Sequence, residues 1–240
     1  MGPRQRDMEI RVLHSWDLSP SQAVELQRSL AEQVDVRSPL PKWDLVAAAD
    51  VSYRKFDPQL FASVVVWSVS ENRVVESASV VAEVRFPYVP GLLSFREAPA
   101  ILEAFKQIRT RPDVVLVDGH GLAHPRRFGV ACHLGLWLEL PTVGCAKTRL
   151  CGSYREPRSV RGSVSPLRIG DECVGQVVRT RAGVRPVFVS AGHRIDLASA
   201  VRVVLTTCHR CRLPEPSRWA HQRVNEARRK ALGVGEDRSV

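Results

Sequence analysis

Apolar and polar residues alternate along the chain in short blocks, which predict a sheet whose strands are separated by turns and helices. Three blocks rich in β-branched residues, at 45–53, 61–69 and 73–84, have the length and composition of strands. Only short polar breaks separate them, and connections of that length favour antiparallel neighbours. The first part of the sheet is therefore predicted to be a three-stranded antiparallel meander.

Helical spacing of apolar residues, together with good capping residues, predicts helices around this meander. Ser19 and Gln22 can form a capping box, and Pro20 suits a first helical position. Asp196 can cap a later helix. Helices are predicted at about 20–34, 93–110, 130–138 and 197–207, with another starting near Ser217. Strands are predicted at 114–117, 142–146, 172–180 and 186–190, and a mobile basic loop at 147–168.

This order of elements predicts an α/β protein with one mixed sheet flanked by helices. A three-stranded antiparallel meander, a helix, and then parallel strands alternating with helices is the order of a ribonuclease H-like fold. At 240 residues the chain is long enough for one substantial core, so residues 1–240 are expected to form a single domain. Residues 1–18 and 233–240 are expected to be loose ends.

The most informative polar residue follows the apolar run at 114–117. Asp118 and Gly119 end this strand abruptly, which places a carboxylate at the edge where open α/β sheets build their sites. A charge beside a core strand needs a partner, and a hard metal ion is one candidate. Asp-Gly is also a common turn dipeptide, so Asp118 could simply cap a turn.

Two further acids are expected near Asp118. Asp50 interrupts the first strand, and in this order of elements the first and fourth strands are neighbours, about 4.8 Å apart. Glu97 falls in the first turn of the helix after the meander, where it could instead pair with the helix dipole. Together the three carboxylates form a hard-oxygen site suited to Mg²⁺, and such sites carry phosphoryl-transfer chemistry.

Basic and aromatic residues offer further chemistry. Histidines can move protons and a lysine can neutralise a phosphate oxygen. The candidates for these roles are His124, Lys147, His193 and His221. Each histidine alone also fits a structural role, and His120 and His133 fit that role better. Tyr88, held between prolines, could wedge between stacked bases or pack back onto the domain.

Composition favours a nucleic-acid-binding protein. The net charge is +10 and the pI about 9.9, which favours nucleic acid before an anionic membrane, although arginine-rich coding bias would also raise the pI. No apolar run approaches the roughly 18 residues of a membrane span, and residues 1–10 lack the apolar core of a signal peptide, so a cytoplasmic location is expected. The six cysteines are expected to be free thiols, with zinc at Cys208–Cys211 as the alternative.

Six sequence blocks resemble the endonuclease V family and occur in the family's order between about residues 44 and 230. The blocks are Asp50–Tyr53, Pro87–Glu97, Asp118–Arg127, Pro141–Lys147, Ser190–Arg194 and Arg212–His221. The second and third blocks are long, and each is specific by itself. The chain departs from the family at Ala191, where a proline is usual, and in an arginine-rich loop at 151–164 that could alter DNA affinity.

The resemblance implies a Mg²⁺-dependent endonuclease of DNA repair, in which Mn²⁺ could substitute for Mg²⁺. It implies that the enzyme nicks the second phosphodiester bond on the 3′ side of a deaminated adenine and leaves a 3′-hydroxyl and a 5′-phosphate. Family members differ in preferring DNA or RNA, so an inosine-specific endoribonuclease is an alternative. The implied partner is DNA containing deoxyinosine, or inosine RNA, with no membrane, and the protein is expected to be a monomer.

The family motifs also imply roles for individual residues. The implied metal ligands are Asp50, Glu97 and Asp118. The implied catalytic and phosphate-binding surface adds His124, Lys147 and His221. The implied wedge, which separates the lesion from its neighbours, consists of Pro87, Tyr88, Pro90 and Gly91. The residues expected near the pocket for the flipped base are Gly121 and Leu122.

Two other functions stay open at the level of sequence. A different ribonuclease H-like nuclease, such as an excision-repair incision subunit or a resolvase, would need the same acids without the Tyr88 loop. It would also cut undamaged or branched substrates. A non-catalytic nucleic-acid binder would bind comparably in EDTA and would tolerate Asp50→Ala. The presence of all three acids argues against the binder.

Overall fold

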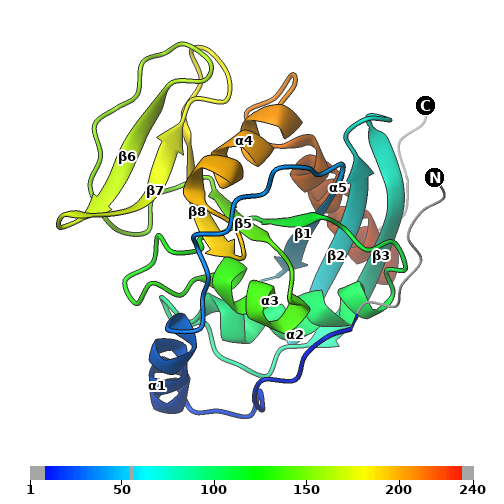
Figure 1. Ribbon diagram of the computed structural model, residues 1–240. Helices are drawn as coiled ribbons and strands as arrows, with labels where there is room; N and C mark the ends of the chain where they lie inside the picture. The colour runs from blue at the N-terminus through cyan, green and yellow to red at the C-terminus, as the bar shows by residue number, and fades with distance from the viewer. Residues whose placement is uncertain (1–8, 55–56, 234–240) are drawn as a thin grey trace.

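The computed structural model describes residues 9–54 and 57–233, and an eight-stranded mixed sheet runs through the middle of them (Figure 1). The strands are β1 (Leu45–Tyr53), β2 (Gln59–Ser68), β3 (Arg73–Glu83), β4 (Val114–Val117), β5 (Thr142–Ala146), β6 (Val164–Ile169), β7 (Glu172–Val178) and β8 (Val187–His193). Their order in the sheet is β3-β2-β1-β4-β5-β8-β7-β6. The predicted mixed α/β sheet is therefore confirmed.

The centre of the sheet explains where the acidic residues lie. Strands β1, β2 and β3 pair antiparallel, which confirms the predicted meander, whereas β4 and β5 run parallel to β1. Strand β4 is buried throughout, as expected for a parallel strand covered on both faces. Its pairing with β1 places Ala49 opposite Val117, so the residues that follow lie at the same edge of the sheet.

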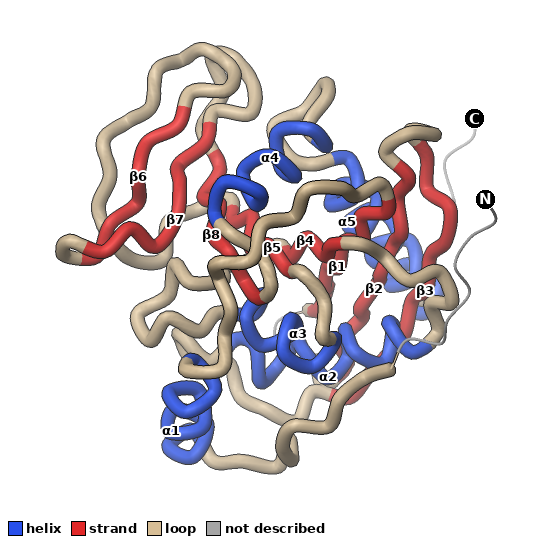
Figure 2. The backbone as a smooth tube through the Cα atoms, viewed as in Figure 1, coloured by secondary structure: helices blue, strands red, loops and turns tan. Residues whose placement is uncertain are grey.

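Four helices cover the two faces of the sheet (Figure 2). They are α2 (Leu93–Lys106), α3 (Val130–Leu138), α4 (Leu197–Thr207) and α5 (Glu215–Ala231), whereas α1 (Pro20–Ala31) lies beyond the sheet and packs in two smaller clusters, with Phe95 and with Phe128. Ala47 of β1 packs in one core with Phe105 of α2 and Leu134 of α3, whereas Val46 packs in the other core with Val203 of α4. This alternation is the period of two expected for a strand buried on both sides. None of the helices in the described residues is long and apolar enough to cross a bilayer.

Residues 9–18, expected to be part of a loose end, instead lie against α3. The Arg11 amide donates a hydrogen bond to the Trp137 carbonyl at 2.8 Å, and Trp16 stacks on Trp137 with 4.9 Å between the ring centroids. Large aromatic side chains bury much apolar surface, so this contact holds the segment in place. The rest of the two expected loose ends, apart from Gly233, lies outside the described residues.

Several boundaries differ from those predicted. Helix α1 begins at its predicted capping box but ends at Ala31, and α2 ends at Lys106, earlier than predicted. The stretch 147–168 is not one loop, because β6 begins at Val164 and pairs with β7. Exposed and buried residues alternate along β6, and Leu167 is fully buried. In the sequence, the many arginines around this short alternating pattern make the stretch resemble a polar loop.

The two C-terminal helices follow their start signals to different degrees. Asp196 accepts a hydrogen bond from the Ser199 amide and caps α4, as predicted. Helix α5 begins at Glu215 rather than at Ser217. A proline follows Glu215 at the start of the helix, where its fixed backbone angle suits the first turn.

Phe105 lies fully buried between α2 and the sheet, and its removal tests this core. Phe105→Ala is expected to lower the free energy of unfolding by about 3–5 kcal/mol, because it removes buried apolar surface and leaves a cavity. Val81→Ala, at an exposed position of β3, is the control and should change that free energy by less than about 0.5 kcal/mol. Urea unfolding measures both variants, and equal losses would contradict the packing described.

Candidate active site

Three acidic residues line one cavity at the edge of the sheet. Asp50 lies in β1 just beyond its pairing with β4, and Asp118 follows β4 directly. Glu97 comes from α2, where it lies in the second turn and not, as predicted, in the first. The three side chains line a cavity of about 370 Å³. The predicted adjacency of these two strands is confirmed, and it brings the acids to one place.

Burial and mutual repulsion raise the pKa values of two of these carboxyl groups. The pKa of Glu97 is raised to about 8, first by burial and then by the charges of Asp50 and Asp118. Burial and the Asp118 charge also raise the pKa of Asp50, although a hydrogen bond with His221 opposes the shift. Carboxyl groups crowded together without enough positive charge resist ionisation, so the cavity favours a cation.

Two side chains offset part of this negative charge, one as a cation and one as a hydrogen-bond donor. The Lys147 ammonium group pairs with the Asp118 carboxylate. His221 Nδ1 lies 2.7 Å from Asp50 Oδ2. Within residues 9–54 and 57–233, the carboxyl group of Glu97 has no hydrogen bond or ion pair, so a negative charge there would be the least compensated of the three.

The donor set fits a hard divalent cation. Carboxylate oxygens are the ligands that Mg²⁺ prefers, and a cation would relieve the repulsion that raises the Glu97 pKa. As the side chains stand, no three acidic, histidine or cysteine groups in the described part of the chain are close enough to ligate one ion. The acids therefore share a cavity, and an ion between them would have to draw them closer together. Since no such group of ligands is found in the described residues, the alternative of zinc at Cys208–Cys211 has no support. The six cysteines are free thiols, as expected.

Helix α5 holds His221 between two polar partners. Nδ1 faces Asp50, and the side-chain nitrogen of Asn225 lies 3.1 Å from Nε2. The side-chain oxygen of Asn225 accepts a hydrogen bond from Ser52 at 3.2 Å, which directs the nitrogen towards His221. An amide nitrogen only donates, so Nε2 is an acceptor and Nδ1 carries the proton donated to Asp50. Asn225 was missed from the sequence, where its only signal is a spacing of one helical turn from His221.

A second cavity, of about 360 Å³, shares Asp118 with the acidic cavity. Tyr88, Pro90 and Gly91 line it, whereas Pro87 does not. Tyr88 is 65% exposed, so it does not pack back onto the domain. An exposed aromatic ring therefore stands at a cavity that is large enough for a base and adjoins the three acids.

Gly121 and Leu122, expected near a base pocket, do not line this cavity. The Leu122 amide donates to the Ala191 carbonyl at 2.8 Å, and the Gly121 amide donates to Ser190 Oγ at 2.9 Å. A Cβ atom at Gly121 would lie 2.1 Å from the Ala191 oxygen, so only glycine fits there. These two residues fix the segment before them, which does line the cavity, against β8.

Backbone groups hold His124 at both ring nitrogens. Nε2 lies 3.1 Å from the Gly91 carbonyl oxygen, and the Arg126 amide donates to Nδ1 at 3.1 Å. A carbonyl only accepts, so Nε2 carries the proton and the ring is neutral. Burial and, secondly, the charge of Arg126 lower the pKa of His124 to about 4. His124 thus lines the second cavity as a neutral side chain with both nitrogens engaged.

Two other histidines, His133 and His193, line neither the acidic cavity nor the second cavity. His193, a candidate from the sequence, accepts a hydrogen bond from the Asp35 amide at 3.2 Å. His133 is fully buried and bonds to Ser94 and His14, which is the structural role expected of it.

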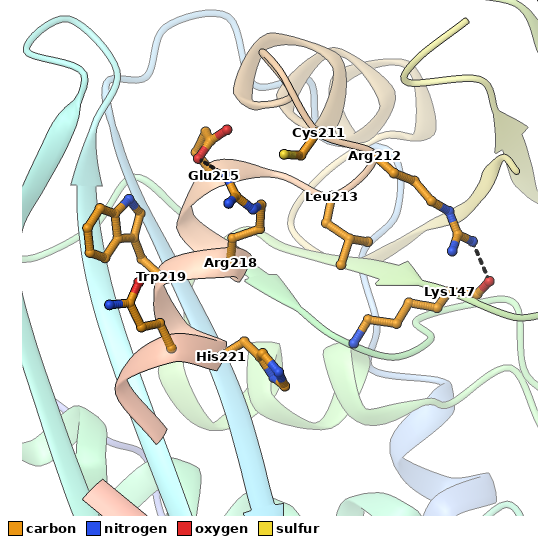
Figure 3. A pocket seen from close by; sticks show the side chains of 9 residues that line it. Lys147, Cys211, Arg212, Leu213, Glu215, Arg218, Trp219 and His221 are labelled. Carbon is orange, nitrogen blue, oxygen red and sulfur yellow. Dashed lines mark hydrogen bonds and ion pairs between the residues drawn. The ribbon is translucent and has the colours of Figure 1, made fainter. Parts of the chain in front are cut away.

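A third cavity, of about 540 Å³, lies along the start of α5 (Figure 3). Lys147 and His221 line it together with Arg212, Arg218 and Trp219. Arg212 also donates to the Lys147 carbonyl at 2.6 Å, which ties the end of β5 to the loop before α5. Cationic and aromatic side chains in this arrangement can contact phosphates and stack on bases.

Known proteins share this chain's sequence and fold. The family model for Endonuclease V matches residues 28–222. An endonuclease V from Gloeobacter violaceus is 49% identical over 231 residues, which cover 95% of this chain and 93% of that protein. The crystal structure of the endonuclease V from Streptomyces avermitilis matches with a TM-score of 0.87 at 40% identity, over 93% of this chain and 99% of that one. The endonuclease V from Ciona intestinalis, in complex with a 24mer DNA containing an inosine followed by a ribo-adenosine, matches with a TM-score of 0.74 at 26% identity, over 88% of this chain and 98% of that one.

The neutral His124 predicts how stability depends on pH. Its pKa is about 4 in the folded chain against an ordinary 6.5, so the unfolded chain binds more protons between these pH values. The free energy of unfolding should therefore fall as the pH drops from 6.5 towards 4, by up to about 3 kcal/mol from this residue. His124→Gln should lose less stability than the wild type over that range in urea unfolding. Parallel losses in the two proteins would show that His124 is not the group responsible.

Proposed function

The chain belongs to the endonuclease V family, and on that basis we propose that it is a Mg²⁺-dependent enzyme of DNA repair that recognises deoxyinosine and nicks the second phosphodiester bond on its 3′ side. One observation carries the proposal: the cavity with three acids and the base-sized cavity beside Tyr88 share the wall formed by Asp118. The complex of the Ciona intestinalis relative with inosine-containing DNA supports the same class of substrate.

Binding would begin at the cationic surface around Lys147. Arg212 and Arg218 line the cavity along α5 and can contact phosphates, while Trp219 offers an aromatic face. The net charge of +10 adds a long-range attraction for a nucleic-acid strand. Phosphate contacts release counterions from the strand, so the affinity should fall steeply as salt is added.

Tyr88 would then separate the lesion from its neighbours. Its ring is exposed, and the prolines on either side limit the conformations of the loop. Moving a base out of the stack costs a few kcal/mol, less for a poorly paired base. The displaced hypoxanthine would occupy the 360 Å³ cavity, where backbone groups of the segment at Gly119 can contact its edge.

Asp50, Glu97 and Asp118 would hold the divalent cation, Mg²⁺ or Mn²⁺, next to this cavity. When bound, the cation would polarise the phosphate and make a water molecule more nucleophilic. Lys147, which pairs with Asp118, can neutralise charge that develops on the phosphate oxygens.

His221 is placed to move a proton beside the acids. Its Nδ1 proton is donated to Asp50, and its Nε2 accepts a hydrogen bond from Asn225. Proton transfer with the substrate at Nε2 would therefore require the reacting group to replace Asn225 as its partner.

An inosine-specific endoribonuclease is a second candidate. The DNA in the Ciona intestinalis complex carries a ribo-adenosine after the inosine, which favours testing ribonucleotides in this chain as well. We also propose that residues 1–240 act as one domain and as a monomer in the cytoplasm. Sedimentation of the purified protein tests the monomer.

Asp118→Asn tests the acidic cavity, because it keeps the size of the side chain and removes its charge. Nicking of an inosine-containing duplex with Mg²⁺ should fall at least about a hundredfold. Asp171→Asn, at an exposed acid in the turn between β6 and β7, is the matched control and should cut like the wild type. Cutting by Asp118→Asn at the wild-type rate, or undiminished cutting in EDTA, would refute the metal assignment.

Matched strands that carry deoxyinosine, riboinosine or no lesion separate the candidate functions. The proposed enzyme should cut the deoxyinosine strand at one position on the 3′ side and leave the undamaged strand intact, because the displaced base has to fill the cavity beside Tyr88. Faster cutting of the riboinosine strand would favour the endoribonuclease. Equal cutting of the undamaged strand would point to a different ribonuclease H-like nuclease.

A further inference from the structure

Gln27 is a buried polar residue that lies outside the six sequence blocks that resemble the endonuclease V family. It belongs to α1, directly before the matched segment 28–222, and is 1% exposed. On the same face of α1 its neighbours are Ala23 and Leu30, about one helical turn away on either side. A polar side chain in an apolar stripe is unfavourable unless its groups are hydrogen-bonded, so its partners show what it does.

Both side-chain N–H groups of Gln27 are donated to backbone carbonyls of two different segments. Nε2 donates to the Gly91 oxygen at 3.1 Å and to the Phe128 oxygen at 2.6 Å, and Oε1 accepts a hydrogen bond from Arg126. Gly91 ends the loop Pro87–Gly91 that carries the exposed tyrosine, and Phe128 lies just before α3. Both residues line the base-sized cavity, so one side chain joins two parts of its wall.

Three donors converge on the Gly91 carbonyl. Besides Gln27, His124 Nε2 lies 3.1 Å and Arg126 Nη2 lies 2.8 Å from the same oxygen. Gly91 has a φ of +80°, which favours glycine, and a Cβ atom there would lie 2.7 Å from Arg126 Nη2. The end of the loop is therefore fixed at one atom, whereas Tyr88 is left exposed.

We propose that Gln27 is a positioning residue for lesion recognition, an inference that rests on the proposed function above. Its side-chain amide fixes the Tyr88 loop relative to the cavity wall, so that the ring enters the stack where the displaced base can enter the cavity. A displacement of about 1 Å in such a group can cost about a hundredfold in rate. The alignment matters most in a duplex, where pairing and stacking oppose the displacement of the base, and less in a single strand.

Three variants separate this role from general stabilisation of the fold. Gln27→Met keeps the length of the side chain and loses all three hydrogen bonds, whereas Gln27→Glu keeps an acceptor for Arg126 and loses both donors. Gln22→Met is the matched control, because it breaks the capping box of the same helix without touching the cavity. Single-turnover rates with Mg²⁺ are measured on inosine in a duplex and in the matching single strand. Fluorescence of a 2-aminopurine beside the inosine reports unstacking.

Both Gln27 variants are expected to cut the duplex about ten- to a hundredfold more slowly than the wild type, with a smaller unstacking signal. On the single strand the loss should be less than about threefold. Gln22→Met should match the wild type on both substrates, even if it unfolds at a lower temperature. Equal losses on the two substrates, an equal loss in Gln22→Met, or wild-type rates in the Gln27 variants would overturn the proposal. A wild-type protein that cuts neither inosine substrate would overturn the proposed function itself.

Discussion

The parallel pairing of β1 with β4 is the constraint on which the rest of the site depends. It brings Asp50 and Asp118, far apart in the sequence, to the same end of two neighbouring strands, and α2 adds Glu97 to the cavity between them. Burial and these two charges raise the pKa of Glu97 to about 8, so this carboxyl group resists ionisation in the absence of a further cation. Strand pairing thus places the acids together, and their oxygen atoms and mutual repulsion favour a cation as the ligand of the cavity.

Lys147 connects this charge with the surfaces around it. The ammonium group pairs with Asp118, and the residue lines both the base-sized cavity and the cavity along α5. A strand whose phosphates follow the cationic side chains along α5 would therefore pass the acids on its way to the cavity beside Tyr88. The three cavities are adjacent because β4, β5 and the loops that follow them end at one edge of the sheet.

Much of the fold was predictable because local signals and the final arrangement agree: β1, α3 and β5 begin and end with their apolar runs. Strand β6 was missed because its buried residue Leu167 stands in a stretch rich in arginine, and such a polar stretch is typical of a loop. In the site, Asp118 and Tyr88 were predictable because each stands out from its immediate neighbours. Gln27 and Asn225 were not, because a one-dimensional pattern does not show which distant carbonyl or ring a helix residue will meet.

Asp50, Glu97 and Asp118 are proposed to hold a divalent cation. Titration of Mn²⁺ into the protein, followed by the electron paramagnetic resonance signal of the free ion, tests this assignment without relying on activity. The wild type and Asp171→Asn should bind Mn²⁺ alike, and Glu97→Gln should bind it at least about tenfold more weakly. Equal Mn²⁺ affinity in the wild type and Glu97→Gln would show that Glu97 does not hold the ion.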